Sequence, residues 1–356
     1  MFAWYKNAIE CYVFLPDVHP VLEKTAITAE SHTIDATKNE GYASFSLSEF
    51  LGSVWFTRGW CLQELLAPRS VNFFNNQFNE IGSKSSLAAH ISVRTGISGD
   101  YLSERRWSLQ RASVAERMRW ASYRQTSREE DVAYCLLGIF DVNMPLLYGE
   151  GQKAFMRLQA EIIKKSTDES IFAWRAPTAP VDGLEDEPGG SIWSRVNMGH
   201  GLLARSPMAF TGVTELHRVN FEFRRHYEMT NRGIRMNVAI PRSSYIREET
   251  MVTALLPLNC VQVVKDGLRD RKEHRLAIKV DLRVDASQQI LEGRRKMVES
   301  SNKSIFLADV ESETSPMSER RLIDKFSAGH HDYEVVLEAP TGPAEDWQIY
   351  FPQDGM

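Results

Sequence analysis

The stretch WFTRGWCLQELLAPRSVNFF, residues 55–74, predicts a short helix that leads into an apolar strand. Tryptophan, cysteine and leucine crowd the helical segment at 58–66, and VNFF at 71–74 has the length and composition of a buried strand. An earlier apolar run, CYVFLPDV at 11–18, is interrupted by a proline and predicts a strand buried on both faces. Two strands joined by so long a crossover predict parallel pairing in a right-handed unit.

The chain as far as residue 174 is otherwise helical in its pattern. Serine caps, glycine stops and apolar spacings of three and four predict helices at 48–56, 83–96, 113–124, 126–140 and 149–166. Gly96 is expected to end the second of these, and Ser113, three residues before Glu116, to cap the third. SIFAW at 170–174 predicts a strand. We therefore expect an α/β domain over residues 1–174.

The period of the sequence changes after a linker. Proline, glycine and acidic residues dominate APTAPVDGLEDEPGG, and we place the linker at 175–190. Beyond it, MVTALLPLNCVQVV and the nearly alternating HRLAIKVDLRV predict strands. Residues 191–356 are therefore expected to form a β-rich domain.

Composition excludes several classes of protein. The 356 residues carry a net charge of −5, so no overall basic field favours nucleic acid or an acidic membrane surface. The four cysteines lie far apart in apolar surroundings, which indicates buried thiols rather than a disulfide framework or a metal site. No apolar run approaches the roughly 20 residues that span a bilayer, and MFAWYKNAIE lacks the features of a secretory signal. These features predict a cytoplasmic protein with no metal, no nucleic-acid partner and no membrane partner.

Glu64 is the main candidate site residue. Trp60 and Glu64 are four residues apart, so they share a helix face beside the predicted sheet. A partly desolvated carboxylate next to an indole can bond a ribose hydroxyl. The alternative is a structural glutamate that pairs with Arg58 or Arg69 or faces water.

Two other motifs favour structural interpretations. The arginine-rich stretch RRWSLQRASVAERMRWASYR suggests a phosphate-binding face, but a solvated helix face with ion pairs is the stronger hypothesis. The glycines of LLYGEGQKAF lack the spacing of a phosphate loop, so we expect a turn at the start of a helix.

Three long stretches resemble the fungal heterokaryon-incompatibility (HET) domain: FAWYKNAIECYVFLPDV, WFTRGWCLQELLAPRSVNFF, and the segment at 113–174 from SVAERMRW to SIFAW. They occur in the family's order within residues 1–174. The later motifs GLLARSP, MTNRGIRM and ALLPLNC look like the domain of unknown function that commonly follows HET domains. The resemblance implies a role in vegetative incompatibility, non-self recognition and programmed cell death.

HET domains are in turn similar to TIR domains. The fold implied is a partial TIR-like parallel sheet with helices, followed by a helical segment and a C-terminal β-rich domain. In TIR proteins that hydrolyse NAD, the catalytic glutamate lies in a Trp-Cys-x-x-Glu-Leu pattern, which matches Trp60 to Leu65 here. The resemblance therefore implies that Glu64 is catalytic and that Trp60 contributes to binding, with NAD as substrate and no cofactor.

One departure from the family pattern bears on activity. The two strands that normally begin a HET domain do not occur in these residues, so we expect an N-terminally truncated domain with little or no NAD hydrolysis. Three function classes follow: a cell-death effector that cleaves NAD, an interaction module that signals by self-association through the HET remnant, and an inert product of a shortened gene.

Overall fold

A computed structural model describes residues 1–20, 33–34, 45–103, 108–175 and 202–218 and, beyond them, the strands between 228 and 350. Two compact units divide the chain, one comprising Met1–Ala112 with Arg119–Leu158 and the other Ser113–Met118 with Gln159–Met356. The linker predicted at 175–190 lies outside the described residues apart from Arg175. The domain boundaries at 174 and 191 therefore stay predictions.

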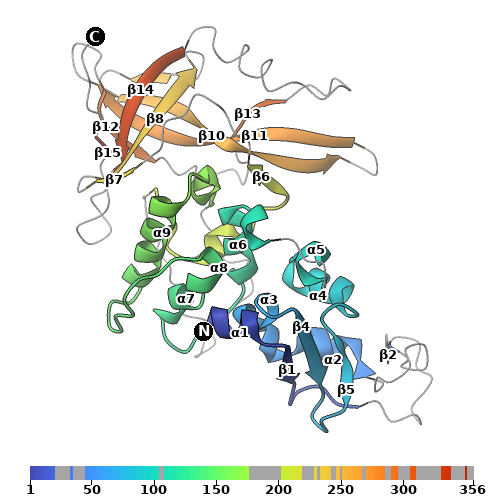
Figure 1. The fold of residues 1–356 in the computed structure, drawn as a ribbon. Helices are drawn as coiled ribbons and strands as arrows, with labels where there is room; N and C mark the ends of the chain where they lie inside the picture. Colours follow the sequence, from blue (N-terminus) through green and yellow to red (C-terminus); the bar gives the residue numbers. More distant parts are fainter. Residues whose placement is uncertain are drawn as a thin grey trace, which may run out of the picture. The chain divides into compact units, whose positions relative to one another are not determined.

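The first unit contains a three-stranded sheet of order β1-β4-β5 (Figure 1). Its strands are β1 (Glu10–Phe14), β4 (Ser70–Phe74) and β5 (Glu80–Ser83). β1 pairs with β4 in parallel over all five residues, and β5 is antiparallel to β4. The parallel pairing predicted for the two apolar runs is confirmed.

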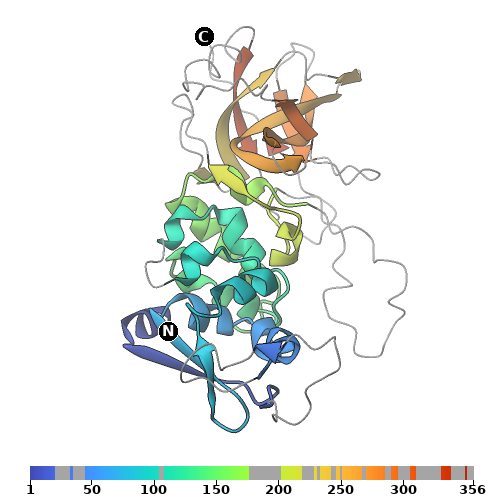
Figure 2. The same cartoon turned by 90° about the vertical axis from the view of Figure 1, so that its right-hand side faces the viewer.

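The prediction that the first run is buried on both faces is wrong. Val13 is buried, whereas the side chains on either side of it, Tyr12 and Phe14, are 66% and 42% exposed. β1 is an edge strand of the described sheet, and both views show it at the margin (Figures 1 and 2). Only the face that carries Val13 meets the core, because the aromatic neighbours of Tyr12 and Phe14 on the other face leave both side chains exposed.

Aromatic side chains from the crossover cover β4. The chain between β1 and β4 forms β2 (Thr33–Ile34), β3 (Phe45–Ser46), α2 (Leu47–Gly52), the 3-10 helix η2 (Val54–Thr57) and α3 (Cys61–Leu66). The rings of Phe50 and Trp55 lie edge-on to Phe73, at centroid distances of 5.4 and 5.6 Å. The helix predicted at 48–56 is thus two helices, because the Ser53 hydroxyl accepts the amide of Trp55 and starts a new turn.

Helical segments follow the sheet: α4 (Ala88–Thr95), α5 (Gly99–Leu102), η3 (Leu109–Arg111), α6 (Val114–Ala121), α7 (Asp131–Tyr134), α8 (Leu137–Phe140) and α9 (Lys153–Lys165). Gly96 ends α4 with φ of 67°, and the Ser113 hydroxyl accepts the amide of Glu116 in α6, so both predicted helix ends are confirmed. The helix predicted at 126–140 is shorter and broken. Gln125 is paired with Thr57 and Gly59, which keeps the chain before Asp131 out of the helix.

In the second unit, SIFAW is not the strand that its composition predicts. Residues Glu169–Phe172 form the 3-10 helix η4, which is wholly buried. Asp168 caps it by accepting the amide of Ser170 over 3.0 Å. The same carboxylate accepts the amide of Val114 over 2.8 Å, at the start of α6. The cap from Asp168 therefore sets the helical backbone of this segment, and its apolar composition reflects only that the segment is buried.

Strands make up most of what is described beyond residue 216. Helix η6 (Pro207–Phe210) precedes a sheet of order β6-β10-β11-β12-β15-β14-β8-β7, in which β13 also pairs with β11 and β9 with β10; Figure 1 labels most of these strands. Its strands are β6 (Leu216–Arg218), β7 (Glu228–Thr230), β8 (Gly233–Pro241), β9 (Ile246–Glu248), β10 (Met251–Asp266), β11 (Asp270–Val284), β12 (Ile290–Arg295), β13 (Ile305–Asp309), β14 (His330–Leu337) and β15 (Ile349–Tyr350). The strands predicted from MVTALLPLNCVQVV and HRLAIKVDLRV are confirmed as β10 and β11, which pair antiparallel.

Polar contacts join η4 and the middle of α9 to the later part of the second unit. Asn259 on β10 donates its amide and its Nδ2 to Glu169, over 2.8 and 3.1 Å. Gln159 exchanges two hydrogen bonds with the backbone of Ala204, over 2.7 and 2.9 Å. Both contacts cross the predicted linker, so Gln159 and η4 on one side of it and Ala204 and Asn259 on the other stabilise each other.

Candidate functional site

Helix α3 presents one half-buried side chain, Glu64, on an otherwise buried helix. Its other residues, from Cys61 to Leu66, are all buried. The helix is anchored at two points: Gln63 donates to the carbonyl of Cys135 over 2.6 Å, and the buried Lys84 donates to that of Leu65 over 3.1 Å. The backbone beneath Glu64 is therefore fixed.

Two side chains from other elements hold the Glu64 carboxylate. The hydroxyl of Tyr5, on α1 (Phe2–Asn7), donates to Oε1 over 3.1 Å. The indole N–H of Trp55, in η2, donates to Oε2 over 3.3 Å. The site thus joins two consecutive elements, η2 and α3, to the distant helix α1.

The structural alternative for Glu64 was a pair with an arginine such as Arg58 or Arg69, or a side chain that simply faces water. Among the described residues, no salt bridge connects Glu64 with any lysine or arginine, and Arg58 and Arg69 are both exposed. A carboxylate can accept about four hydrogen bonds, and Tyr5 and Trp55 supply two. Glu64 is therefore oriented by neutral donors and keeps its capacity to accept bonds from a ligand.

Trp60 does not have the place that the spacing of four residues suggested. It lies at the N-terminal boundary of α3 and is half-exposed, and the indole that bonds Glu64 belongs to Trp55. The spacing between Trp55 and Glu64 is nine residues, which no helical period predicts. The turn of η2 brings Trp55 back to the carboxylate, and Tyr5 approaches from a helix 59 residues away in the sequence. Sequence reasoning missed both residues for that reason.

The groups around Glu64 are kept protonated. Burial, followed by the charge of Glu64 and the hydrogen bond to it, raises the pKa of Tyr5 to about 12. The same causes in the same order raise the pKa of the Cys61 thiol to about 12. Burial first, and then the charge of Glu64, also raise the pKa of Cys11. Neither thiol has the lowered pKa of a nucleophilic cysteine.

A buried arginine lies near the same cluster. Arg124 donates to the carbonyls of Trp120 and Arg58, over 3.3 and 2.9 Å, and its Nη2 has no partner among the described residues. Burial lowers the pKa of Arg124 to about 10, so it remains a cation at neutral pH. The prediction that the arginine-rich stretch forms a solvated face is wrong for Arg124 and Arg117, which are both buried. Each of the two side chains donates to backbone carbonyls.

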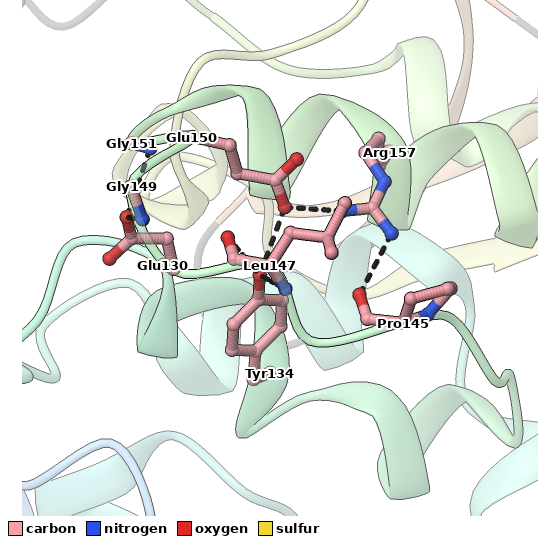
Figure 3. Close-up of polar contacts among 8 residues, drawn as sticks. All are labelled: Glu130, Tyr134, Pro145, Leu147, Gly149, Glu150, Gly151 and Arg157. Carbon is pink, nitrogen blue, oxygen red and sulfur yellow. Dashed lines mark hydrogen bonds and ion pairs between the residues drawn. The ribbon is translucent and has the colours of Figure 1, made fainter.

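A second polar cluster fixes the loop before α9 (Figure 3). The amides of Gly149 and Gly151 donate to Glu130, over 2.7 and 3.1 Å. A hydrogen bond from its own backbone amide, followed by these two from the glycines, lowers the pKa of Glu130. Both glycines have positive φ, of 102° and 56°. The glycine motif therefore forms the predicted turn at the start of a helix, and its amides bind an internal carboxylate.

The same loop is held from its other side. The Tyr134 hydroxyl accepts the amide of Leu147 over 2.8 Å and lies 2.9 Å from Glu150, which in turn forms an ion pair with Arg157 (Figure 3). Arg157 also donates to the carbonyl of Pro145 over 2.8 Å. This cluster has satisfied partners throughout, so its role is to shape the loop.

Among the described residues, no three His, Cys, Asp or Glu side chains gather where they would hold a metal ion. None of the described helices is long and apolar enough to cross a membrane.

Comparison with known proteins gives two similarities. The chain is 44% identical over 165 residues to vegetative incompatibility protein HET-E-1 of Podospora anserina. That match covers 46% of this chain and 11% of the relative, so the chain spans about a tenth of the relative's length. Residues 153–257 match a domain of unknown function, DUF8212. No solved structure matches significantly.

The DUF8212 match begins at the first residue of α9 and ends within β10. The matched region therefore includes η4, which begins at Glu169, and the hydrogen-bonded pair of Gln159 and Ala204. The matched region crosses the linker predicted at 175–190, as the buried contacts of the second unit do.

Proposed function

We propose that this chain acts in fungal vegetative incompatibility, the process named in its relative, as a non-self recognition and cell-death protein. The similarity of 44% over 165 residues is the observation that supports this role. Such similarity over nearly half of the chain favours a common fold and a common biochemical role for the matching segment.

In that role, the proposed reaction is hydrolysis of NAD at Glu64. The bond between nicotinamide and ribose breaks, and nicotinamide leaves with the bonding electrons. Water adds to the ribose carbon and loses a proton, which gives ADP-ribose. The Glu64 carboxylate would hold the ribose hydroxyls and stabilise the oxocarbenium-like centre as positive charge develops.

The contacts of Glu64 suit this reaction. Among the described residues no salt bridge joins its carboxylate to a lysine or arginine, and Tyr5 and Trp55 fix both oxygens. Trp60 is half-exposed one helical turn before Glu64 and remains the candidate for stacking on a base of the substrate. We also propose that the sheet containing β1 and β4 is part of a TIR-like parallel sheet.

Purified protein tests the reaction. We would assay the 356-residue chain alone, and the same chain preceded by the two N-terminal strands of a related HET domain, for release of nicotinamide from NAD. The account expects the extended form to turn over NAD, and Glu64→Gln to reduce turnover by about a hundredfold or more. Glu161→Gln, on α9 beside Lys164, is the matched control and should leave turnover unchanged.

A separate observation favours the second hypothesis, that the chain acts as an interaction module that self-associates. Large apolar side chains are exposed along α1, β1 and the turn after β4, namely Trp4, Ile9, Tyr12, Phe14 and Phe78. Phe14 and Phe78 stack at a centroid distance of 4.5 Å. An apolar edge of this kind favours association. Light scattering tests it: Phe14→Lys should lower the mass of any self-associated form, and an unchanged mass would reject this edge as the contact.

A further inference from the structure

The two donors that hold Glu64 are unlike the partners of a structural glutamate. Tyr5 donates a hydrogen bond to one carboxylate oxygen and Trp55 donates one to the other. Both donors are neutral, so they fix the plane of the carboxylate without cancelling its charge. A lysine or arginine would provide a similar orientation but would oppose the stabilisation of a developing positive charge.

We propose that Tyr5 and Trp55 are positioning residues for Glu64 in NAD cleavage, an inference that rests on the function proposed above. They keep the carboxylate in one rotamer, so that its remaining lone pairs face the reacting ribose. Orientation of this kind contributes much of an enzyme's rate, because a small displacement of the reacting group is costly.

Trp55 is the rigid member of the pair. Its ring is only 7% exposed and lies edge-on to Phe56 and Phe73, at centroid distances of 5.1 and 5.6 Å. These contacts fix the direction of the indole N–H. Oε2 of Glu64 therefore meets a donor that cannot rotate away without disturbing the core around β4.

The position of the Tyr5 hydroxyl depends on how helix α1 is held in place. This helix has no fully buried residue, and it is seated where Phe2 lies against Gly138 of α8. A Cβ added at Gly138 would lie 2.1 Å from the Cβ of Phe2, so glycine permits this close approach. The raised pKa of Tyr5, about 12, keeps its hydroxyl a donor throughout the neutral range.

The chain offers a matched control for Tyr5. Tyr12 also donates its hydroxyl to a glutamate, Glu10, but on the exposed face of β1. Tyr5→Phe and Tyr12→Phe each remove one Tyr–Glu hydrogen bond and keep the ring. A difference between the two variants therefore reports the identity of the glutamate rather than the chemistry of the substitution.

The experiment compares Tyr5→Phe, Tyr12→Phe and Trp55→Phe in whichever form of the full chain, alone or extended, shows Glu64-dependent NAD cleavage. We expect Tyr5→Phe to lower kcat by about ten- to a hundredfold, with KM changed less than about twofold, because the bond orients the catalytic group. Tyr12→Phe should leave both constants unchanged. Trp55→Phe should lower kcat similarly, and thermal unfolding measures any loss of core stability separately.

The outcomes separate the two proposals. If NAD cleavage depends on Glu64 but Tyr5→Phe behaves like Tyr12→Phe, the positioning inference is wrong and the proposed reaction stands. A rise in kcat for Tyr5→Phe would also overturn it, because Tyr5 would then restrain Glu64 rather than orient it. If neither form cleaves NAD in a Glu64-dependent way, both proposals are rejected.

Discussion

Trp55 donates its indole N–H to Oε2 of Glu64 over 3.3 Å, although nine residues separate them. The contact exists because η2 turns the chain back before α3 begins. The tryptophan that contacts Glu64 is therefore Trp55, and not Trp60 as the spacing of four residues suggested.

The two tryptophans should therefore differ in their contribution to stability. Trp55 is buried among aromatic rings, so Trp55→Ala should lower the free energy of unfolding by about 3–5 kcal/mol. Trp60 is half-exposed, and Trp60→Ala should cost less than about 2 kcal/mol. Urea denaturation of both variants measures the difference. Equal losses would show that Trp60 is as deeply buried as Trp55.

The Cys61 thiol should report the charge of Glu64. Burial, then the Glu64 charge and its hydrogen bond, raise the pKa of Cys61 to about 12, so little thiolate exists at pH 8. Glu64→Gln removes the last two causes, and the lowered pKa should speed alkylation of Cys61 by iodoacetamide. Cys135 is the control, because its pKa of about 12 arises chiefly from burial and has no contribution from Glu64. Mass spectrometry of the peptides gives both rates; a parallel rise at Cys61 and Cys135 would indicate general opening instead.

Stability should fall in alkaline solution. The pKa values of Cys61 and Cys135 are raised from 9.0 to about 12, and that of Tyr5 from 10.0 to about 12. Between pH 9 and 12 the unfolded chain has lost these protons while the folded chain keeps them, so rising pH favours unfolding. The contribution of these groups is complete below pH 9 and is lost towards pH 12. Urea denaturation at pH 8 to 11 checks this, and a free energy of unfolding that stays level or rises would contradict it.

The buried contact between Glu169 and Asn259 should matter for the second unit. Glu169→Ala leaves the Asn259 amide without its acceptor at a partly buried position, which should cost about 1–3 kcal/mol. Glu161→Ala removes a surface pair with Lys164 and should cost less than about 1 kcal/mol. Thermal unfolding of the two variants compares them, and a Glu169→Ala variant as stable as Glu161→Ala would show that water replaces the lost bond.

The sequence predicts well those elements whose signals are local or periodic. The parallel pairing of β1 with β4 follows from two apolar runs and a long crossover. The stop at Gly96 and the cap at Ser113 follow from backbone chemistry. Glu64 was found as a candidate because it is the one acid in a helix crowded with cysteine and leucine.

The rest depends on contacts between distant parts of the chain. The donation from Tyr5 to Glu64 spans 59 residues, and no pattern in the sequence indicates it. SIFAW is apolar enough for a strand, yet Asp168 caps it into a helical turn. Arg117 and Arg124 are charged, yet backbone carbonyls make their burial tolerable. In each case a tertiary partner decides against the local preference.

The NAD content of fungal cells that express the extended chain, with Glu64 or with Glu64→Gln, tests the central claim most directly. Gln keeps the size of the side chain and most of its hydrogen bonding but removes the charge opposite the developing cation, a loss typically worth about 3 kcal/mol or more. We expect that NAD falls and cells die with Glu64, and that both effects disappear with Glu64→Gln at equal protein level. Cell death that persists with Glu64→Gln while NAD stays constant in both strains would contradict it.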